Sequence, residues 1–538
     1  MTGALAVPLT GTRPLLRATL RYDGRRFVPW VLLATLLPAS SAAVYPRTFP
    51  TPAARGALAA GVGSNPALGL VLGPADDLAT VDGFTVWRGL ALGGLLVALG
   101  AVLAVVRTTR GQEDSGQAEL LASGVLGRAA RLVTGVALAL LGSLAAGVVA
   151  GVVTGLCGAS WPVALLLGAT FTATGWVLAA VAAVAAQLSA DGRTATTLAV
   201  GTLGVLFLAR GLSSSLDLPA WTLWANPLGW VQLTRPATDG RWWPLLPAVA
   251  LTVAGVAAAA VLESRRDLGQ GVLTPGPGPA RGTTGSGWRL AVRLDAGVLV
   301  TWACASALLG LALGYLTTSV DDLLRGNAVV RSLLAAGATD PGELTAAFVR
   351  TVVSLVGILA SVAGVQVVLR VRAEELAGRL EPVLATAVSR TRYLAGHVVL
   401  ALTATGGALL VAGAAIALVA GQAGTGVSSA GVLRQALATV PAGWAVVAVA
   451  VAVVGTRPAA AALAWAGVLV AFLLTLLGPA LGLDDAVLAA SPFWHVPTLA
   501  GSAGAAGAGW TGLAGVGGVA AVLLAAGFAG FRHRDVGR

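Results

Sequence analysis

The sequence predicts an all-α polytopic membrane protein with about 12 transmembrane helices, arranged as two parallel six-helix repeats. Hydrophobic residues make up 57% of the chain and charged residues 11%, whereas about a quarter of the residues in a soluble domain are charged. Apolar runs recur that are long enough to cross a bilayer. A pattern of charged residues also occurs twice, at a constant separation. These observations exclude a water-soluble domain.

Twelve apolar runs approach the roughly 20 residues that a membrane-spanning helix needs. They lie near residues 28–44, 88–107, 132–156, 162–187, 195–212, 243–262, 295–316, 350–370, 393–420, 434–454, 459–480 and 511–531. The sequence has no lysine, and 24 of its 34 basic residues fall on one side of this topology. This bias predicts that both termini are cytoplasmic. The net charge of +11 therefore reports orientation, and without a compact basic domain no nucleic-acid partner is expected.

Residues 1–27 precede the first span and predict a cytoplasmic amphipathic N-terminal helix. Arginine recurs at every fourth position, at Arg13, Arg17, Arg21 and Arg25, with leucines beside it on a helical surface. Such a helix would lie at the membrane surface with its arginines toward lipid head groups or a partner. An ordinary positively charged flank of the first span explains the same residues, and both interpretations place the segment in the cytoplasm.

The chain divides into two halves joined by a linker. The first six-span half covers residues 28–262, and the second covers residues 295–531. Residues 263–294 form the predicted cytoplasmic linker, which is rich in Gly, Pro, Thr and Ser between Leu268 and Trp288. Residues 532–538 form a cytoplasmic tail. Because each half has an even number of spans, the halves are predicted to be related by an axis along the membrane normal.

The internal repeat has an offset of 262 positions. The matching pairs are Arg88 and Arg350, Arg110 and Arg372, Glu113 and Glu375, Gly116 and Gly378, Glu119 and Glu381, and Arg128 and Arg390. Two further pairs, Arg193 with Arg457 and Pro227 with Pro492, extend the match at offsets of 264 and 265, as small loop insertions would give. Such a duplication is typical of transporters with internal pseudo-twofold symmetry.

Most of these pairs fall in the segment between the second and third spans of each half. We call residues 109–129 the first charged loop and residues 371–391 the second charged loop. The candidate site residues are Glu113, Asp114, Gly116, Glu119 and Arg128 in the first, and Glu374, Glu375, Gly378, Arg379, Glu381 and Arg390 in the second.

In the second copy the apolar positions predict a short amphipathic helix. They are Leu376, Leu380, Val383, Leu384, Ala387 and Val388. The acids would present negative charge on an otherwise positive cytoplasmic face. Docking of a basic surface of a cytoplasmic partner explains this charge. Ion pairs with Arg379, Arg390 and Arg392 are another explanation, a purely structural one.

The string VRAEELAGRLEPVLATAVSRTRYLAGH, residues 371–397, resembles the cytoplasmic segment of ABC-type exporter permeases of the antibiotic or polyketide exporter branch, in their fused two-half form. The segments NPLGW and SPFWH before the last span of each half also resemble that branch, and the resemblance covers most of the chain. It implies a coupling helix that docks on an ATPase subunit, with roles for Glu113, Glu119, Glu375 and Glu381. The first copy departs from the second, because Gln112 and Gln117 stand where the second has Glu374 and Arg379.

The energy source is predicted to lie on another polypeptide. A P-loop requires a lysine that reaches the nucleotide phosphates, and this chain has none. We therefore expect no enzyme activity and no cofactor on this chain. ATP and Mg would be held by the partner ABC ATPase subunit, in two copies for the two charged loops. His397, His495 and His533 have no ligand spacing, so no metal site is expected.

The favoured function is an exporter of hydrophobic or amphipathic compounds, such as antibiotics, in the plasma membrane of a bacterium. The alternative is a twelve-span, proton-coupled secondary carrier for drug efflux. Proton-coupled carriers use ionisable residues within the membrane, and the predicted spans contain few of them. A membrane-embedded enzyme or a scaffold is the third class, and no catalytic group of residues supports it.

Overall fold

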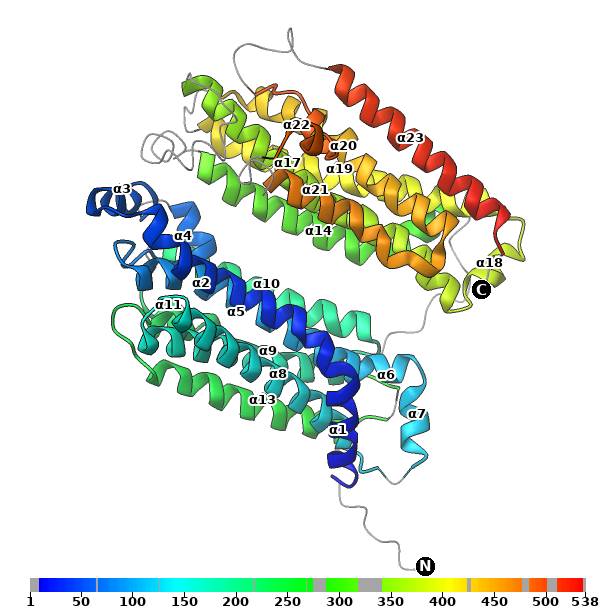
Figure 1. Cartoon of the computed structure of the whole chain (residues 1–538). Helices are drawn as coiled ribbons and strands as arrows, with labels where there is room; N and C mark the ends of the chain where they lie inside the picture. The colour runs from blue at the N-terminus through cyan, green and yellow to red at the C-terminus, as the bar shows by residue number, and fades with distance from the viewer. Residues whose placement is uncertain are drawn as a thin grey trace, which may run out of the picture. The chain divides into compact units, whose positions relative to one another are not determined.

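The computed structural model describes residues 9–63, 66–124, 126–215, 218–267, 269–273, 287–317, 341–422, 427–476, 483–500 and 510–535. Every regular element in these residues is a helix. Twelve of the helices are long and apolar enough to span a membrane, which confirms the predicted all-α membrane fold. Backbone contacts divide the chain into two compact units, Met1–Gly278 and Pro279–Arg538 (Figure 1). Each unit is described by itself below.

The first unit contains six spanning helices and several short ones. In chain order its elements are α1 (Thr12–Asp23), η1 (Gly24–Phe27), α2 (Val28–Thr48), α3 (Pro52–Gly63), α4 (Pro66–Leu72), α5 (Val81–Thr108), α6 (Arg110–Asp114), α7 (Gln117–Ala122), α8 (Ala130–Leu156), α9 (Trp161–Leu188), α10 (Gly192–Ser215), α11 (Trp221–Trp224), α12 (Pro227–Leu233), η2 (Trp243–Leu245) and α13 (Leu246–Ser264). The segment between the first and second spans contains two further helices, α3 and α4.

Helices α5 and α9, the second and fourth spans, lie at the centre of the first unit. Glycine allows their close packing with neighbouring helices. A Cβ atom on Gly147 of α8 would lie 2.3 Å from the carbonyl oxygen of Gly168 on α9, and the reverse distance is 2.2 Å. The ring of Phe171 on α9 likewise fills the space beside Gly93 of α5. These glycines therefore allow close approach between neighbouring spans.

The second unit repeats this arrangement. Its described elements are α14 (Gly287–Thr317), α17 (Pro341–Leu376), α18 (Leu380–Leu384), α19 (Arg390–Gln422), α20 (Ser429–Thr456), η3 (Pro458–Trp465), α21 (Ala466–Leu476), α22 (Asp485–Leu488), η4 (Pro492–His495) and α23 (Trp510–His533). Helices α17 and α20 are its central spans, and they are again the second and fourth of their half.

Several predicted boundaries fall partly outside the described residues. Of the predicted linker 263–294, residues 268 and 274–286 are outside them, and α14 already begins at Gly287. Of the predicted tail 532–538, residues 536–538 are outside them, and α23 continues to His533. Between the seventh and eighth spans, residues 318–340 lie outside them as well.

Candidate functional site

The two charged loops lie at corresponding ends of their units. In the first unit, α6 and α7 occupy the same end of the helix bundle as α1 (Figure 1). In the second unit, α18 lies near the C-terminal end of α23 (Figure 1). In each half, therefore, the loop after the second span meets the end of the sixth span, and the polar contacts of the site are concentrated there.

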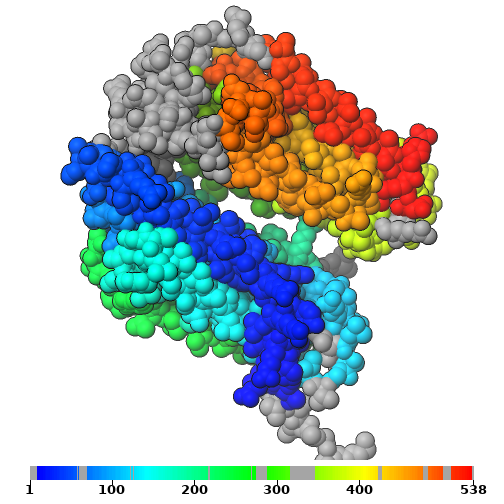
Figure 2. All heavy atoms as spheres, viewed as in Figure 1, coloured from blue at the N-terminus to red at the C-terminus, as the bar shows by residue number. Residues whose placement is uncertain are grey.

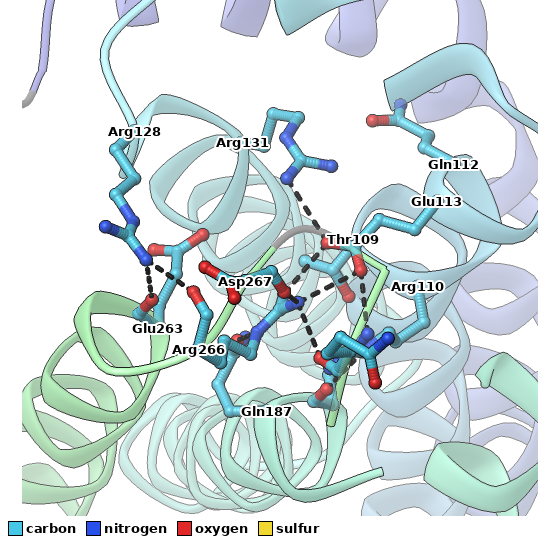
Figure 3. Close-up of polar contacts among 12 residues, drawn as sticks. Thr109, Arg110, Gln112, Glu113, Arg128, Arg131, Gln187, Glu263, Arg266 and Asp267 are labelled. Atoms are coloured by element: carbon cyan, nitrogen blue, oxygen red, sulfur yellow. Dashed lines mark hydrogen bonds and ion pairs between the residues drawn. The ribbon is translucent and has the colours of Figure 1, made fainter. Parts of the chain in front are cut away.

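Glu113 of α6 is the centre of the contacts in the first loop. Its side chain is only 4% exposed. Its carboxylate lies 2.7 Å from Arg110 Nη1, 2.8 Å from Arg266 Nη2 and 3.2 Å from Arg131 Nη2 (Figure 3). Arg266 also donates from Nη1 to the second carboxylate oxygen at 3.1 Å, so this pair is bidentate. The paired cations compensate the carboxylate for its removal from water.

The same arginines extend the contacts to other helices of the first unit. Arg110, which is fully buried, donates to the carbonyl of Ala186 in α9 and to that of Gln270 at 2.9 Å. Arg266 Nε donates to Gln187 Oε1 at 2.6 Å. Figure 3 shows Arg266 reaching between Gln187 and Glu113. The first loop is thereby fixed to the ends of α9 and α13.

Glu375 has the corresponding position in the second loop. Its side chain has 0% exposure. Arg534, which follows α23, donates to its two carboxylate oxygens at 2.6 and 2.9 Å. Arg372 lies 3.1 Å from the same carboxylate. The group Arg372, Glu375 and Arg534 thus repeats the group Arg110, Glu113 and Arg266, although the third member of each lies beyond the segment in which the sequence repeat is clear.

The arginine that closes each loop also binds the end of the sixth span. Arg128 Nη2 donates to the carbonyl oxygen of Glu263 at 3.1 Å and to that of Arg266 (Figure 3). Arg390 Nη1 donates to the carbonyl oxygens of Arg534 at 2.7 Å and Arg532 at 3.4 Å. The last carbonyls of a helix have no partner within it. Arg128 and Arg390 supply such partners at and just beyond the ends of α13 and α23.

A left-handed glycine separates the buried carboxylate from the short helix that follows. The backbone φ is +73° at Gly116 and +68° at Gly378. No atom lies within 4 Å of a Cβ atom built on either glycine, so the backbone conformation alone requires this residue. The two repeated glycines therefore make the same turn, before α7 and before α18.

The other repeated acid faces solvent in both loops. Glu119 of α7 is exposed, and beside it Leu120 is 77% exposed. Glu381 and Pro382 of α18 are exposed as well, whereas Leu380 is buried and anchors α18 to the core. Figure 2 shows the first charged loop, in light blue, on the molecular surface beside α1. Each loop consequently presents its repeated acid, Glu119 or Glu381, on a short helix.

Some expectations for the second loop require correction. Glu374 and Glu375 were expected to present negative charge, but both are buried and paired with arginines. Leu376 was expected on the apolar side of the short helix, but it is 71% exposed, because α17 ends there before the turn. Ala387 is exposed too, whereas Val383, Leu384 and Val388 do pack against the core.

The expected ion pairs within the second loop are realised in part. Arg379 donates to Glu374 at 2.6 and 3.2 Å. This hydrogen bond raises the pKa of the Arg379 guanidinium above its ordinary value. Arg390 instead binds backbone carbonyls, as described above. Among the described residues, Arg392 has no acidic partner within ion-pair distance.

Asp114 contributes to the first loop as a helix cap. Its carboxylate accepts a hydrogen bond of 2.8 Å from the backbone N–H of Gly192, the first residue of α10. The first N–H groups of a helix lack partners within it, and an acidic residue there is stabilising. Asp114 thus joins the first loop to the start of the fifth span.

Sequence reasoning missed several buried ionisable residues within the spans. Asp295 of α14 and His397 of α19 are both buried, with His397 Nδ1 3.9 Å from Asp295 Oδ2 and Arg370 Nη1 3.8 Å from Asp295 Oδ1. Arg210 of α10 is buried as well and donates to the carbonyl of Val71 at 2.9 Å. Asp295 and His397 lie within the predicted spans, but only the packing of α14 against α19 brings them together. The expectation that the spans are almost free of such residues is therefore too strong.

The fold and these loops define a polytopic membrane permease built from two similar six-span halves. The family model for the C-terminal domain of the multidrug efflux system permease Rv1217c matches residues 51–262 and 285–532. The chain is also 36% identical over 545 residues to the multidrug efflux system permease protein Rv1217c of Mycobacterium tuberculosis (strain ATCC 25618 / H37Rv), covering 98% of this chain and 95% of that protein. The chain therefore belongs to this family of multidrug efflux permeases.

Proposed function

We propose that this chain is the transmembrane permease subunit of an ABC exporter that moves hydrophobic or amphipathic compounds, antibiotics among them, out of the cell. A separate ATPase subunit supplies the energy by docking on the two charged loops. The observation that carries this proposal is the duplicated, exposed acid, Glu119 on α7 and Glu381 on α18. Each is presented by a short helix that follows the same glycine turn.

The build of the loops favours docking of a partner. Each short helix follows a buried carboxylate that arginines hold in place, so the position of the exposed acid is fixed. Complementary charge at an interface speeds association and sets its register. Two loops in one chain correspond to two ATPase copies. Glu113 and Glu375 support the loops from within in this proposal, and Glu119 and Glu381 meet the partner.

The chain itself supplies no recognisable site for ATP. It has no lysine for a P-loop, so ATP and Mg would bind to the partner subunit. The positive-inside rule favours a cytoplasmic position for both charged loops and both termini, together with the linker around residues 263–294. This orientation puts the exposed acids where a cytoplasmic ATPase can reach them.

A cavity in the first unit supports an apolar cargo. It has a volume of about 390 Å³ and lies between α8, α9 and α13. Its lining includes Leu144, Val148 and Leu165 together with Trp176 and Trp242. Pockets for small molecules have volumes of about 300–1,000 Å³ and mostly apolar walls. A hydrophobic compound drawn from the membrane fits this chemistry.

Charge reversal of the exposed acids tests the docking proposal. We expect Glu119→Arg and Glu381→Arg, alone and combined, to reduce the amount of ATPase that copurifies with the tagged permease from its native host. The combined variant should lose most of it, because both docking sites are changed. Asp485→Arg, an exposed acid outside the charged loops, is the matched control. Unchanged copurification in the combined variant would contradict the proposal.

The buried contact between Asp295 and His397 favours a second candidate, the proton-coupled efflux carrier. Ionisable residues inside a membrane are costly and commonly belong to ion or proton pathways. The two candidate functions differ in their energy source. Efflux that an uncoupler abolishes and that survives loss of the ATPase would favour the carrier, whereas efflux that requires ATP hydrolysis favours the exporter.

A further inference from the structure

In both halves, an arginine just beyond the sixth span inserts into the charged loop. Arg266 lies two residues past the end of α13, and Arg534 lies one residue past the end of α23. Each makes a bidentate pair with the buried glutamate, at 2.8 and 3.1 Å in the first unit and 2.6 and 2.9 Å in the second. The partners are 153 and 159 residues apart in sequence. We call these two ion pairs, Arg266–Glu113 and Arg534–Glu375, the clamps. Each is a tertiary contact that links the segment after the second span to the end of the sixth span.

A second contact fastens the other end of each loop to the same place. Arg128 and Arg390 lie after the short helices and donate to the last carbonyls of α13 and α23, or to carbonyls just beyond them. Each loop is thus tied to the end of the sixth span on both sides of its exposed helix. A displacement of α7 or α18 cannot occur without moving the end of α13 or α23, unless these contacts break.

The sixth spans are suited to such movement. Only 17% of the apolar stretch of α13 and of α23 is buried within the protein, compared with 78% for α9. Each sixth span packs mainly against one other span, α13 against α9 and α23 against α20, and a peripheral helix costs less free energy to displace than a central one. The clamp therefore connects an exposed loop to one of the least embedded spans of its half.

We infer that Arg266 and Arg534 are positioning residues that transmit displacement of the charged loops to α13 and α23. The inference rests on the proposed function for the source of the displacement, which is the ATPase docked on Glu119 and Glu381. The rigid connection itself is independent of that source. Buried ion pairs are often replaceable by apolar residues without loss of stability, so a clamp of the same geometry in both halves is better explained by transmission than by stability alone.

The test is made in the second half, where Arg534 pairs with both carboxylate oxygens of Glu375 at 2.6 and 2.9 Å. We expect Glu375→Gln and Arg534→Gln to lower transport far more than ATPase copurification, because Glu381, which meets the partner, is unchanged. Transport per ATP hydrolysed should fall about tenfold, within the range that mutations between two coupled sites produce. The charge swap of Glu375→Arg with Arg534→Glu should recover part of the loss. Normal coupling in both single variants would overturn the inference, and so would equal loss of copurification and transport.

A cross-linking experiment distinguishes loss of this contact from misfolding of the variants. In a chain with Cys157→Ala and Cys304→Ala, the pair Glu375→Cys and Arg534→Cys removes the charges but permits a short dithiol-specific reagent to restore the connection. Recovery of transport on cross-linking supports transmission through this point. A folded variant that stays uncoupled after complete cross-linking would contradict it.

A measurement without the ATPase separates this inference from the proposed function. Spin labels at Leu376→Cys and Val522→Cys, both exposed positions at the second loop and on α23, report their distance in the cysteine-free chain. A narrow distance distribution that broadens with Arg534→Gln supports the clamp even if no ATPase partner exists. A distance distribution that is broad in the parent, or unchanged by the substitution, would contradict the inferred connection between the second loop and α23. The proposed function would remain open.

Discussion

At the scale of single residues, the repeated acids divide into two roles. The offset of 262 identified Glu113, Glu119, Glu375 and Glu381 as a related set, but the sequence could not tell which of them are buried. Burial of Glu375 depends on Arg534, which is 159 residues away. The repeat also marked Gly116 and Gly378, but their left-handed turns, with φ of +73° and +68°, appeared only in the structure.

The two kinds of acid should differ in their contribution to stability. Glu375→Gln removes the buried carboxylate that pairs with Arg372 and Arg534, and breaking a buried pair costs about 3–5 kcal/mol. Glu381→Gln changes an exposed side chain and should alter the free energy of unfolding by about 0.5 kcal/mol or less. Thermal unfolding of both variants in detergent, followed by tryptophan fluorescence, measures the difference. Equal midpoints would show that the Glu375 pair contributes nothing.

At the scale of elements, hydropathy predicted every described span, because a lipid-exposed helix must be apolar over its whole length. The short helices were harder to predict. The second short helix was expected from its apolar spacing, but the expected apolar side included Leu376, which ends α17 and is exposed. Helices α3 and α4 were missed, because runs rich in Gly and Pro usually indicate irregular structure.

The cavity beside α8 gives a prediction for cargo. Val148→Trp places a large ring in the cavity from a position that is already exposed on α8. Efflux of bulky apolar compounds should fall by about 10- to 200-fold, since a misfit of one methylene group in a hydrophobic pocket is worth about 1–3 kcal/mol. Val152→Trp, one turn further along α8 and outside the cavity lining, is the control. Equal efflux by both variants, at the parental rate, would remove this cavity from the transport route.

At the scale of the whole molecule, the internal duplication is present in the structure as well as in the sequence. Each unit has its second and fourth spans at the centre, and each charged loop is fastened to the end of the sixth span. The family relationship covers both halves. What composition and spacing could not supply is the contact between distant helices, so the clamps and the Asp295–His397 pair became visible only in the folded chain.

The proposal that a separate ATPase drives this permease is tested most directly by identifying the subunits that copurify with it. The tagged chain, purified from its native host in mild detergent, should carry an ATPase subunit at about two copies per permease, one for each charged loop. A chain that purifies alone and moves drugs in liposomes under a proton gradient, without ATP, would contradict the account and establish the carrier instead.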